Sequence, residues 1–131
     1  MCLMGKQKII IVEDDTVLRD LYLRKFKTDV YDVRTASNGQ DALDLVSKEV
    51  PDLMLLDLNM PVMDGFTVLQ TLTKEKRSFP IIILTNFDDQ VSRERGMALG
   101  GDDYFVKKNM TIKSLLEMVE KLLAKKTTTT V

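Results

Sequence analysis

The sequence of 131 residues contains no histidine and a single cysteine, Cys2. Without histidine, the chain can form neither a Ser-His-Asp triad nor a histidine-ligated metal site, and it cannot carry a phosphohistidine itself. A single cysteine can form neither an internal disulfide bond nor a cysteine-based zinc cluster. Any chemistry in this chain therefore depends on other polar side chains.

The chain also lacks an excess of charge of either sign and any long apolar run. It has 19 basic and 20 acidic residues, for a net charge of -1, whereas a dedicated nucleic-acid-binding protein usually has a basic excess. No apolar run approaches the roughly 20 residues that span a membrane. The segment Met1–Lys8 is too short and too polar for a signal peptide. We therefore expect a cytoplasmic protein that makes no direct contact with nucleic acid or membrane.

Four short apolar runs indicate strands that are covered on both faces of a sheet. A fifth segment, Tyr31–Arg34, alternates apolar and polar residues, which indicates an edge strand with one wetter face. The four apolar runs are Ile9–Val12, Leu53–Leu56, Ile81–Leu84 and Tyr104–Val106.

A helical pattern, with apolar residues three and four positions apart, follows each of these segments. The first helix is expected from Val17 to Phe26, with Asp15 or Thr16 as its N-cap. Gly100-Gly101 is expected to stop the fourth helix in a left-handed conformation. The other four patterns span Ala42–Val46, Val68–Leu72, Asp88–Leu99 and Ile112–Leu123.

Strands that alternate with single helices predict parallel pairing through right-handed crossovers. We expect one α/β domain over residues 7–125, a three-layer (βα)5 sandwich with a five-stranded parallel sheet. The threonine-rich segment 126–131 has nothing to pack and is predicted to be a disordered tail.

Polar side chains stand where four of the five predicted strands end. Glu13 and Asp14 follow the first strand, Asp57 the third, Thr85 the fourth and Lys107 the fifth. The carboxyl ends of parallel strands lie at one edge of a sheet, so these side chains should converge there. Three carboxylates repel one another, and one lysine cannot neutralise them. An all-oxygen set of this kind selects a hard cation such as Mg²⁺.

The segment Asp57–Gly65 (DLNMPVMDG) resembles the signature around the phosphoacceptor of response-regulator receiver domains. Glu13-Asp14, Thr85 and Tyr104–Lys107 fall at the spacings of the same family. The resemblance extends from Lys8 to Ala124, which is nearly the whole chain. It implies a flavodoxin-like (βα)5 fold whose parallel sheet has the strand order 2-1-3-4-5.

The resemblance implies a phosphorylation site that depends on Mg²⁺. Asp57 would be the nucleophile that becomes an aspartyl phosphate. Asp14 and Asp57 would bind the metal through carboxylate oxygens and Asn59 through its backbone carbonyl, whereas Glu13 would hold it through a coordinated water.

The resemblance also implies a conformational switch that phosphorylation controls. Lys107 would pair first with Asp57 and then with a phosphoryl oxygen. Thr85 would move inward to donate its hydroxyl to another phosphoryl oxygen, and Tyr104 would follow by changing its packing.

The resemblance predicts two kinds of partner. Because the chain has no histidine, the phosphoryl donor would be a histidine kinase, a phosphotransfer protein or a small acyl phosphate. A downstream protein would bind the face of the fourth helix, fifth strand and fifth helix. With no output domain in sight after the fifth helix, we expect a stand-alone receiver and not an enzyme acting on other substrates.

Two positions depart from the family pattern. Lys108 replaces the usual proline after the lysine, and because a non-proline cis bond costs about 2.5–4 kcal/mol, we expect a trans Lys107–Lys108 bond. Asn86 replaces the usual small residue after Thr85, which could alter the entry of donors or the lifetime of the phosphate.

Two alternative functions use the same residues. The chain could be a receiver-like interaction module that works without phosphorylation, although it retains Asp57, Thr85 and Lys107. It could also be an aspartate-nucleophile phosphohydrolase of the haloacid-dehalogenase type. That family needs a second acid two residues after the nucleophile, and Asn59 stands there.

Overall fold

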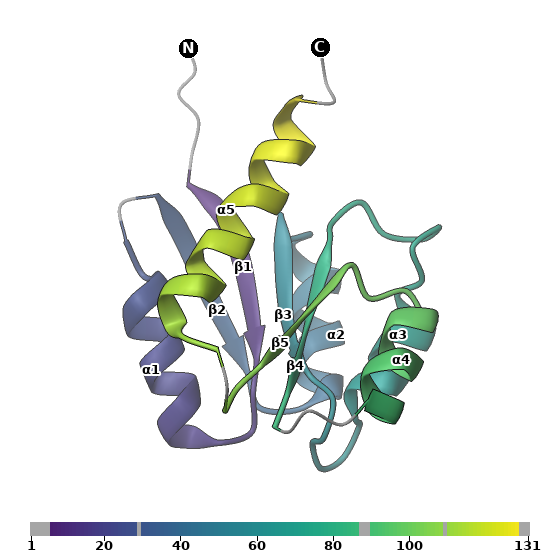
Figure 1. Cartoon of the computed structure of the whole chain (residues 1–131). Helices are drawn as coiled ribbons and strands as arrows, with labels where there is room; N and C mark the ends of the chain where they lie inside the picture. Colours follow the sequence, from purple (N-terminus) through teal and green to yellow (C-terminus); the bar gives the residue numbers. More distant parts are fainter. Residues whose placement is uncertain (1–5, 29, 87–89, 109, 129–131) are drawn as a thin grey trace.

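The computed structural model describes residues 6–28, 30–86, 90–108 and 110–128, with residues 125–128 described by their backbone alone. Strands and helices alternate along the chain, as the hydrophobic pattern predicts (Figure 1). The strands are β1 (Gln7–Val12), β2 (Tyr31–Ala36), β3 (Leu53–Asp57), β4 (Ile81–Thr85) and β5 (Asp103–Val106). The helices are α1 (Thr16–Phe26), α2 (Gly39–Lys48), α3 (Gly65–Thr71), α4 (Gln90–Ala98) and α5 (Ile112–Thr128).

The five strands form one parallel sheet in the order β2-β1-β3-β4-β5. This confirms the predicted order and the edge position of β2. The registers place Val12 beside Leu56, Asp57 beside Leu84 and Thr85 beside Val106. All strands therefore end at the same edge of the sheet, the lower edge in Figure 1.

Side chains of successive strand residues alternate between two buried clusters, because a strand repeats every two residues. The cluster between the sheet and helices α1 and α5 includes Ile9, Ile11, Leu55, Phe26 and Leu115. The cluster between the sheet and helices α2, α3 and α4 includes Ile10, Leu56, Ile83, Leu69 and Met97. The three layers thus follow from apolar runs whose residues are buried on both faces.

Acidic or amide side chains cap three helices at their N-termini. Asp15 accepts hydrogen bonds from the backbone amides of Val17 and Leu18, which confirms its predicted role as a cap. Asn38 and Asp64 cap α2 and α3 in the same way, and the glycine after each is the first residue of the helix.

The fourth and fifth helices differ slightly from the sequence pattern. Helix α4 begins at Gln90, and residues 88 and 89, where its start was predicted, lie outside the described residues. Gly100 has φ +118°, which confirms the predicted left-handed stop. Helix α5 continues to Thr128, so the first three residues of the predicted tail are helical and the rest lies outside the described residues. No helix within the described ranges is both long and apolar enough to cross a membrane.

A buried arginine ties the ends of α3 and α4 to the sheet at the edge opposite the polar strand ends. The Arg77 side chain is 2% exposed and lies 2.8 Å from the Asp102 carboxylate. Its guanidinium also donates hydrogen bonds to the backbone carbonyls of Leu72, Phe79 and Gly100. This clamp holds the loop before β4 and the turn before β5 in place.

Candidate functional site

The polar side chains at the strand ends divide between the two faces of the sheet. Glu13, Asp57 and Lys107 continue the alternation of the strand residues that face α1 and α5. Thr85 follows Ile83 by two residues and therefore continues the opposite face, to which Tyr104 also belongs. The ionisable groups and the two predicted switch residues thus continue opposite faces of the sheet at one edge.

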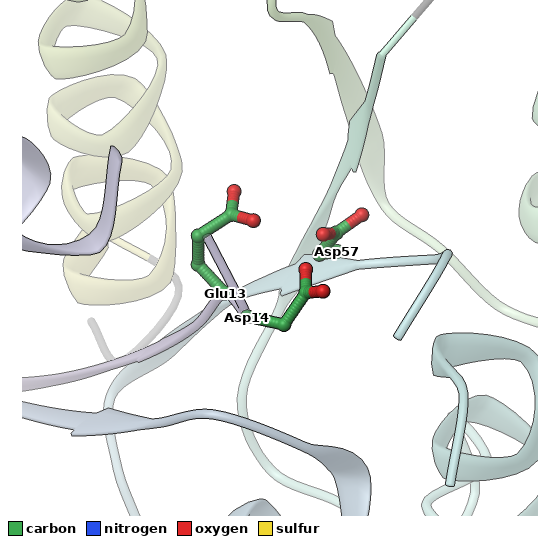
Figure 2. Close-up of side chains that lie close together, drawn as sticks. All are labelled: Glu13, Asp14 and Asp57. Carbon is green, nitrogen blue, oxygen red and sulfur yellow. The ribbon is translucent and has the colours of Figure 1, made fainter. Parts of the chain in front are cut away.

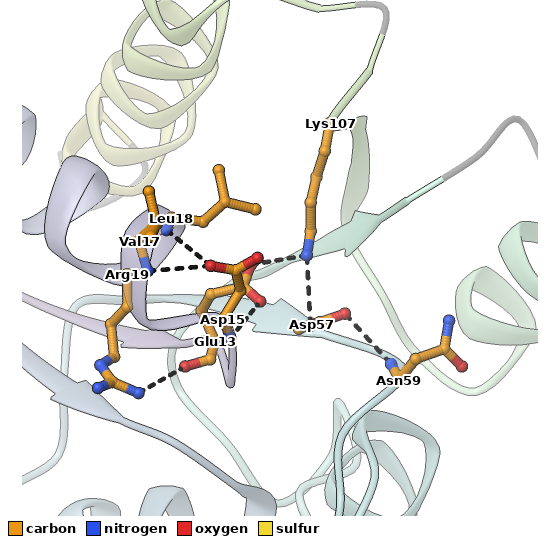
Figure 3. Close-up of polar contacts among 8 residues, drawn as sticks. All are labelled: Glu13, Asp15, Val17, Leu18, Arg19, Asp57, Asn59 and Lys107. Carbon is orange, nitrogen blue, oxygen red and sulfur yellow. Dashed lines mark hydrogen bonds and ion pairs between the residues drawn. The ribbon is translucent and has the colours of Figure 1, made fainter.

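Lys107 bridges two buried carboxylates. Its Nζ lies 2.6 Å from Oε1 of Glu13 and 3.3 Å from Oδ2 of Asp57 (Figure 3). The sequence resemblance implied a first pairing of Lys107 with Asp57, but the shorter contact is with Glu13. The second oxygen of Glu13 accepts a hydrogen bond from the backbone amide of Asp15 at 3.2 Å. The chain thus engages both oxygens of Glu13, whose side chain is 0% exposed.

The Asp57 carboxyl group lies in an environment that disfavours its charge. Burial, followed by the neighbouring Glu13, raises the pKa of Asp57 from an ordinary value of 3.8 to about 8. Lys107 and a 3.2 Å hydrogen bond from the backbone amide of Asn59 oppose this rise without cancelling it. A further positive charge near Asp57 would therefore favour its ionised form.

Three carboxylates are close enough to hold one cation. One carboxylate oxygen from each of Glu13, Asp14 and Asp57 lies within 4.8 Å of the other two. Figure 2 shows the three side chains converging from the loop after β1 and from the end of β3. Asp14 is exposed, whereas the other two are buried. These residues fit Mg²⁺, because the donors are all oxygen and Lys107 balances only part of their charge.

The loop after Asp57 is held in a strained backbone conformation. Val62 has φ +67°, and it is the only non-glycine residue with positive φ in the part of the chain that the structure describes. A 2.7 Å hydrogen bond from the amide of Met63 to the carbonyl of Pro61 closes a γ-turn around it. A β-branched residue rarely adopts this conformation, and no turn signal in the sequence indicated it.

Gly65 lets helix α3 approach the backbone of the acceptor strand. A Cβ atom at this position would lie 2.5 Å from the carbonyl oxygen of Asp57 and 2.8 Å from Cα of Leu58. The Gly65 amide instead donates a 3.0 Å hydrogen bond to the carbonyl of Leu58. Position 65 therefore requires glycine, because any side chain there would clash with the backbone at the end of the strand that carries Asp57.

Thr85 presents a buried hydroxyl group at the end of β4. Its side chain is 4% exposed, and Oγ1 has no hydrogen-bond partner among the residues that the structure describes. An unsatisfied buried hydroxyl costs about 1–3 kcal/mol. Such a group, at the same sheet edge as the carboxylate cluster, is suited to an oxygen acceptor that arrives with a ligand.

The two departures from the family pattern lie in the loops that follow β4 and β5. The Lys107–Lys108 bond is trans, as are all peptide bonds within the described ranges, and this agrees with the prediction. The amide of Lys107 still donates a 2.8 Å hydrogen bond to the carbonyl of Thr85, which keeps the lysine in line with the sheet. Asn86 is exposed next to Thr85.

The comparisons with known proteins agree with this geometry. Residues 9–120 match the family profile of the response regulator receiver domain. The chain is 39% identical over 124 residues to "Probable transcriptional regulator ycf27" of Porphyridium aerugineum, covering 90% of this chain and 51% of the relative. It is 36% identical over 120 residues to "Alkaline phosphatase synthesis transcriptional regulatory protein PhoP" of Bacillus subtilis, covering 87% and 50%.

A solved structure shows the same fold over nearly its whole length. The Francisella response regulator 1452 receiver domain superposes with a TM-score of 0.83 at 29% identity, covering 92% of this chain and 98% of that chain. By contrast, the chain spans about half the length of the curated relatives named above. The profile match, the strand order and the acidic strand ends together show that this chain belongs to the response-regulator receiver domains, the signalling-switch domains of two-component systems.

Proposed function

We propose that Asp57 accepts a phosphoryl group in a Mg²⁺-dependent reaction and that the fold responds by changing its packing around Thr85 and Tyr104. The observation that carries the proposal is the position of Asp57. It is a buried carboxylate at the end of a central strand, with Lys107 at 3.3 Å and two further carboxylates close by. No apolar packing explains this cluster, whereas a metal ion and a phosphoryl group would satisfy it.

The transfer forms one bond and breaks one. A carboxylate oxygen of Asp57 attacks the phosphorus of a phosphohistidine on a partner protein, so that a P–O bond forms while the P–N bond breaks. The bonding electrons leave with the imidazole of the donor, which takes up a proton from solvent. Asp14, Asp57 and the backbone carbonyl of Asn59 would hold Mg²⁺, whose positive charge would offset the repulsion between the carboxylates and the phosphoryl oxygens.

Residues of the chain hold the new group. Lys107 already lies between Glu13 and Asp57, and a small movement of its ammonium group brings it to a phosphoryl oxygen. The unpartnered hydroxyl of Thr85 can donate to another oxygen. Glu13, with both oxygens engaged by the chain, would act on the metal through a coordinated water.

The output of this reaction is a change of shape that a partner protein reads. The phosphoryl donor would be a histidine kinase or a phosphotransfer protein in the cytoplasm. A downstream protein would bind the face of α4, β5 and α5, and the domain that performs these steps would span residues 7–125. The chain would catalyse its own phosphorylation and dephosphorylation but no reaction on other substrates.

Intact mass after incubation with acetyl phosphate and Mg²⁺ tests the proposal. The protein should gain one phosphoryl group, about 80 Da. Asp57→Asn should abolish the gain, and EDTA should block it. Asp20→Asn, which removes an exposed acid from α1, is the matched control and should be phosphorylated normally. Labelling that survives Asp57→Asn would place the acceptor elsewhere, and no labelling in any variant would favour an interaction module.

A further inference from the structure

Helix α4 carries two arginines that each stack on an aromatic ring of a neighbouring element. The guanidinium carbon of Arg93 lies 4.7 Å from the centroid of the Tyr104 ring on β5. That of Arg95 lies 4.0 Å from the centroid of the Phe66 ring on α3. Both distances are within the range of a cation–π interaction. The two contacts have the same chemistry, but only the first involves a predicted switch residue.

The Tyr104 ring lies on the same face of the sheet as the unpartnered hydroxyl of Thr85. The register pairs Ile83 with Tyr104 and Thr85 with Val106, so Tyr104 is two residues from the partner of Thr85 on the adjacent strand. Tyr104 packs against the cluster between the sheet and α2, α3 and α4, and it is half-buried. Arg93 therefore contacts the ring from the helix that directly follows the loop after Thr85.

We propose that Arg93 is a positioning residue that holds the Tyr104 ring in the conformation of the unphosphorylated protein. This inference rests on the proposed function, in which Thr85 moves towards a phosphoryl group and Tyr104 changes its packing. A ring stacked under a guanidinium group must break that contact before it can change its rotamer. Arg93 thus opposes the activated conformation and sets how readily phosphorylation populates it.

The size of the effect follows from the strength of the contact. A cation–π interaction at a partly exposed site changes a two-state equilibrium by about two- to fivefold. A ligand that binds the activated conformation must overcome this bias, so its apparent affinity falls by the same factor when that conformation is the minor one. Removal of the guanidinium group should therefore make activation easier.

Binding of beryllofluoride, a phosphoryl mimic, in the presence of Mg²⁺ measures this bias. Arg93→Gln should bind beryllofluoride about two- to fivefold more tightly than the unsubstituted protein. Arg93→Lys keeps the charge but loses the planar group and should bind with intermediate affinity. Arg95→Gln makes the same change of charge on the same helix and should leave the affinity unchanged.

The role of the Tyr104 ring is tested by a double substitution and by a spectroscopic signal. In a Tyr104→Leu background, Arg93→Gln should have no further effect on beryllofluoride affinity. The protein has three tyrosines, so labelling with 3-fluorotyrosine should give three ¹⁹F resonances, and Tyr104→Phe identifies that of Tyr104. In Arg93→Gln without beryllofluoride, this resonance should lie closer to its beryllofluoride-bound position.

Several results would overturn the inference. Equal beryllofluoride affinities of Arg93→Gln and Arg95→Gln would mean that Arg93 acts only as a surface charge. Weaker beryllofluoride binding by Arg93→Gln would mean that Arg93 supports the activated state. An undiminished Arg93 effect in the Tyr104→Leu background would exclude action through the ring. Failure of the unsubstituted protein to bind beryllofluoride would instead refute the proposed function, so the two failures are distinguishable.

Discussion

The substitution Asp57→Asn should make the metal-free protein more stable at neutral and alkaline pH. Asparagine has nearly the shape of aspartate but carries no charge. In the native fold the Asp57 carboxylate is 1% exposed and lies close to Glu13 and Asp14, with Lys107 as its cationic partner. Removal of this charge relieves the cost of burying it and its repulsion by Glu13, both of which folding creates.

The direction and the pH range follow from the pKa of Asp57. Its pKa is about 8 in the folded protein and near 3.8 when unfolded, so folding favours the protonated form. The stability from this group is fully present below pH 3.8 and is lost as the pH rises through 8. The difference between variant and unsubstituted protein should therefore be near zero at pH 4, grow through neutral pH and become constant above pH 8.

The pKa shift sets an upper limit of roughly 5–6 kcal/mol on this difference. This limit already includes the opposing attraction of Lys107, and side-chain relaxation and water entry reduce the cost of a buried charge, so we expect a net gain of about 2–3 kcal/mol at pH 8. For a domain of this size, such a gain raises the melting temperature by roughly 5–15 °C.

Urea and thermal unfolding between pH 4 and pH 9, in EDTA, would measure the difference. Asp14→Asn is the matched control, because its carboxylate is exposed and its loss should change stability by less than about 0.5 kcal/mol without metal. Added Mg²⁺ should stabilise the unsubstituted protein more than Asp57→Asn. The test compares the difference in unfolding free energy between Asp57→Asn and the unsubstituted protein at the two pH values. A difference that is no larger at pH 8 than at pH 4 would refute the reasoning.

Two further predictions concern positions outside the carboxylate cluster. Val62→Gly should stabilise the protein by about 0.5–1 kcal/mol in urea unfolding, because the valine is 84% exposed and its φ of +67° is strained; a loss of stability would show that the γ-turn is not strained. Arg77→Met should destabilise the fold by about 3–5 kcal/mol, because three backbone carbonyls lose their arginine donor and Asp102 loses its buried cationic partner. Lys74→Met removes the exposed partner of Asp102 at 3.6 Å and should cost less than 1 kcal/mol, and equal effects of the two substitutions would contradict the clamp.

The strands and their parallel pairing could be predicted because the relevant signals are local, whereas the strand order came with the family resemblance. Continuous apolar runs such as Ile9–Val12 and Ile81–Leu84 indicate strands that are buried on both faces. The alternation of these strands with single helices is compatible with only a few topologies. The convergence of Glu13, Asp14 and Asp57 followed from the rule that parallel strands end at one edge. These parts of the site depend on the backbone alone.

The features that the sequence did not reveal depend on side-chain geometry. The shorter contact of Lys107 with Glu13 depends on the reach of two flexible side chains. The positive φ of Val62 is imposed by its surroundings against its own preference, so its residue type gave the opposite signal. Arg77 binds mainly backbone carbonyls, and because every residue has one, the sequence does not indicate its partners. The stacking of Arg93 on Tyr104 joins α4 to β5, and the hydrophobic pattern does not tell how close these two elements lie.

The most direct test of the account identifies the phosphorylated residue. The protein is treated with acetyl phosphate and Mg²⁺, reduced with borohydride, digested and sequenced by tandem mass spectrometry, since borohydride converts an acyl phosphate into an alcohol. The account predicts homoserine at position 57 in the treated sample and aspartate there when Mg²⁺ is replaced by EDTA. Homoserine at another position, or unmodified Asp57 under conditions that phosphorylate a known receiver domain in parallel, would contradict it.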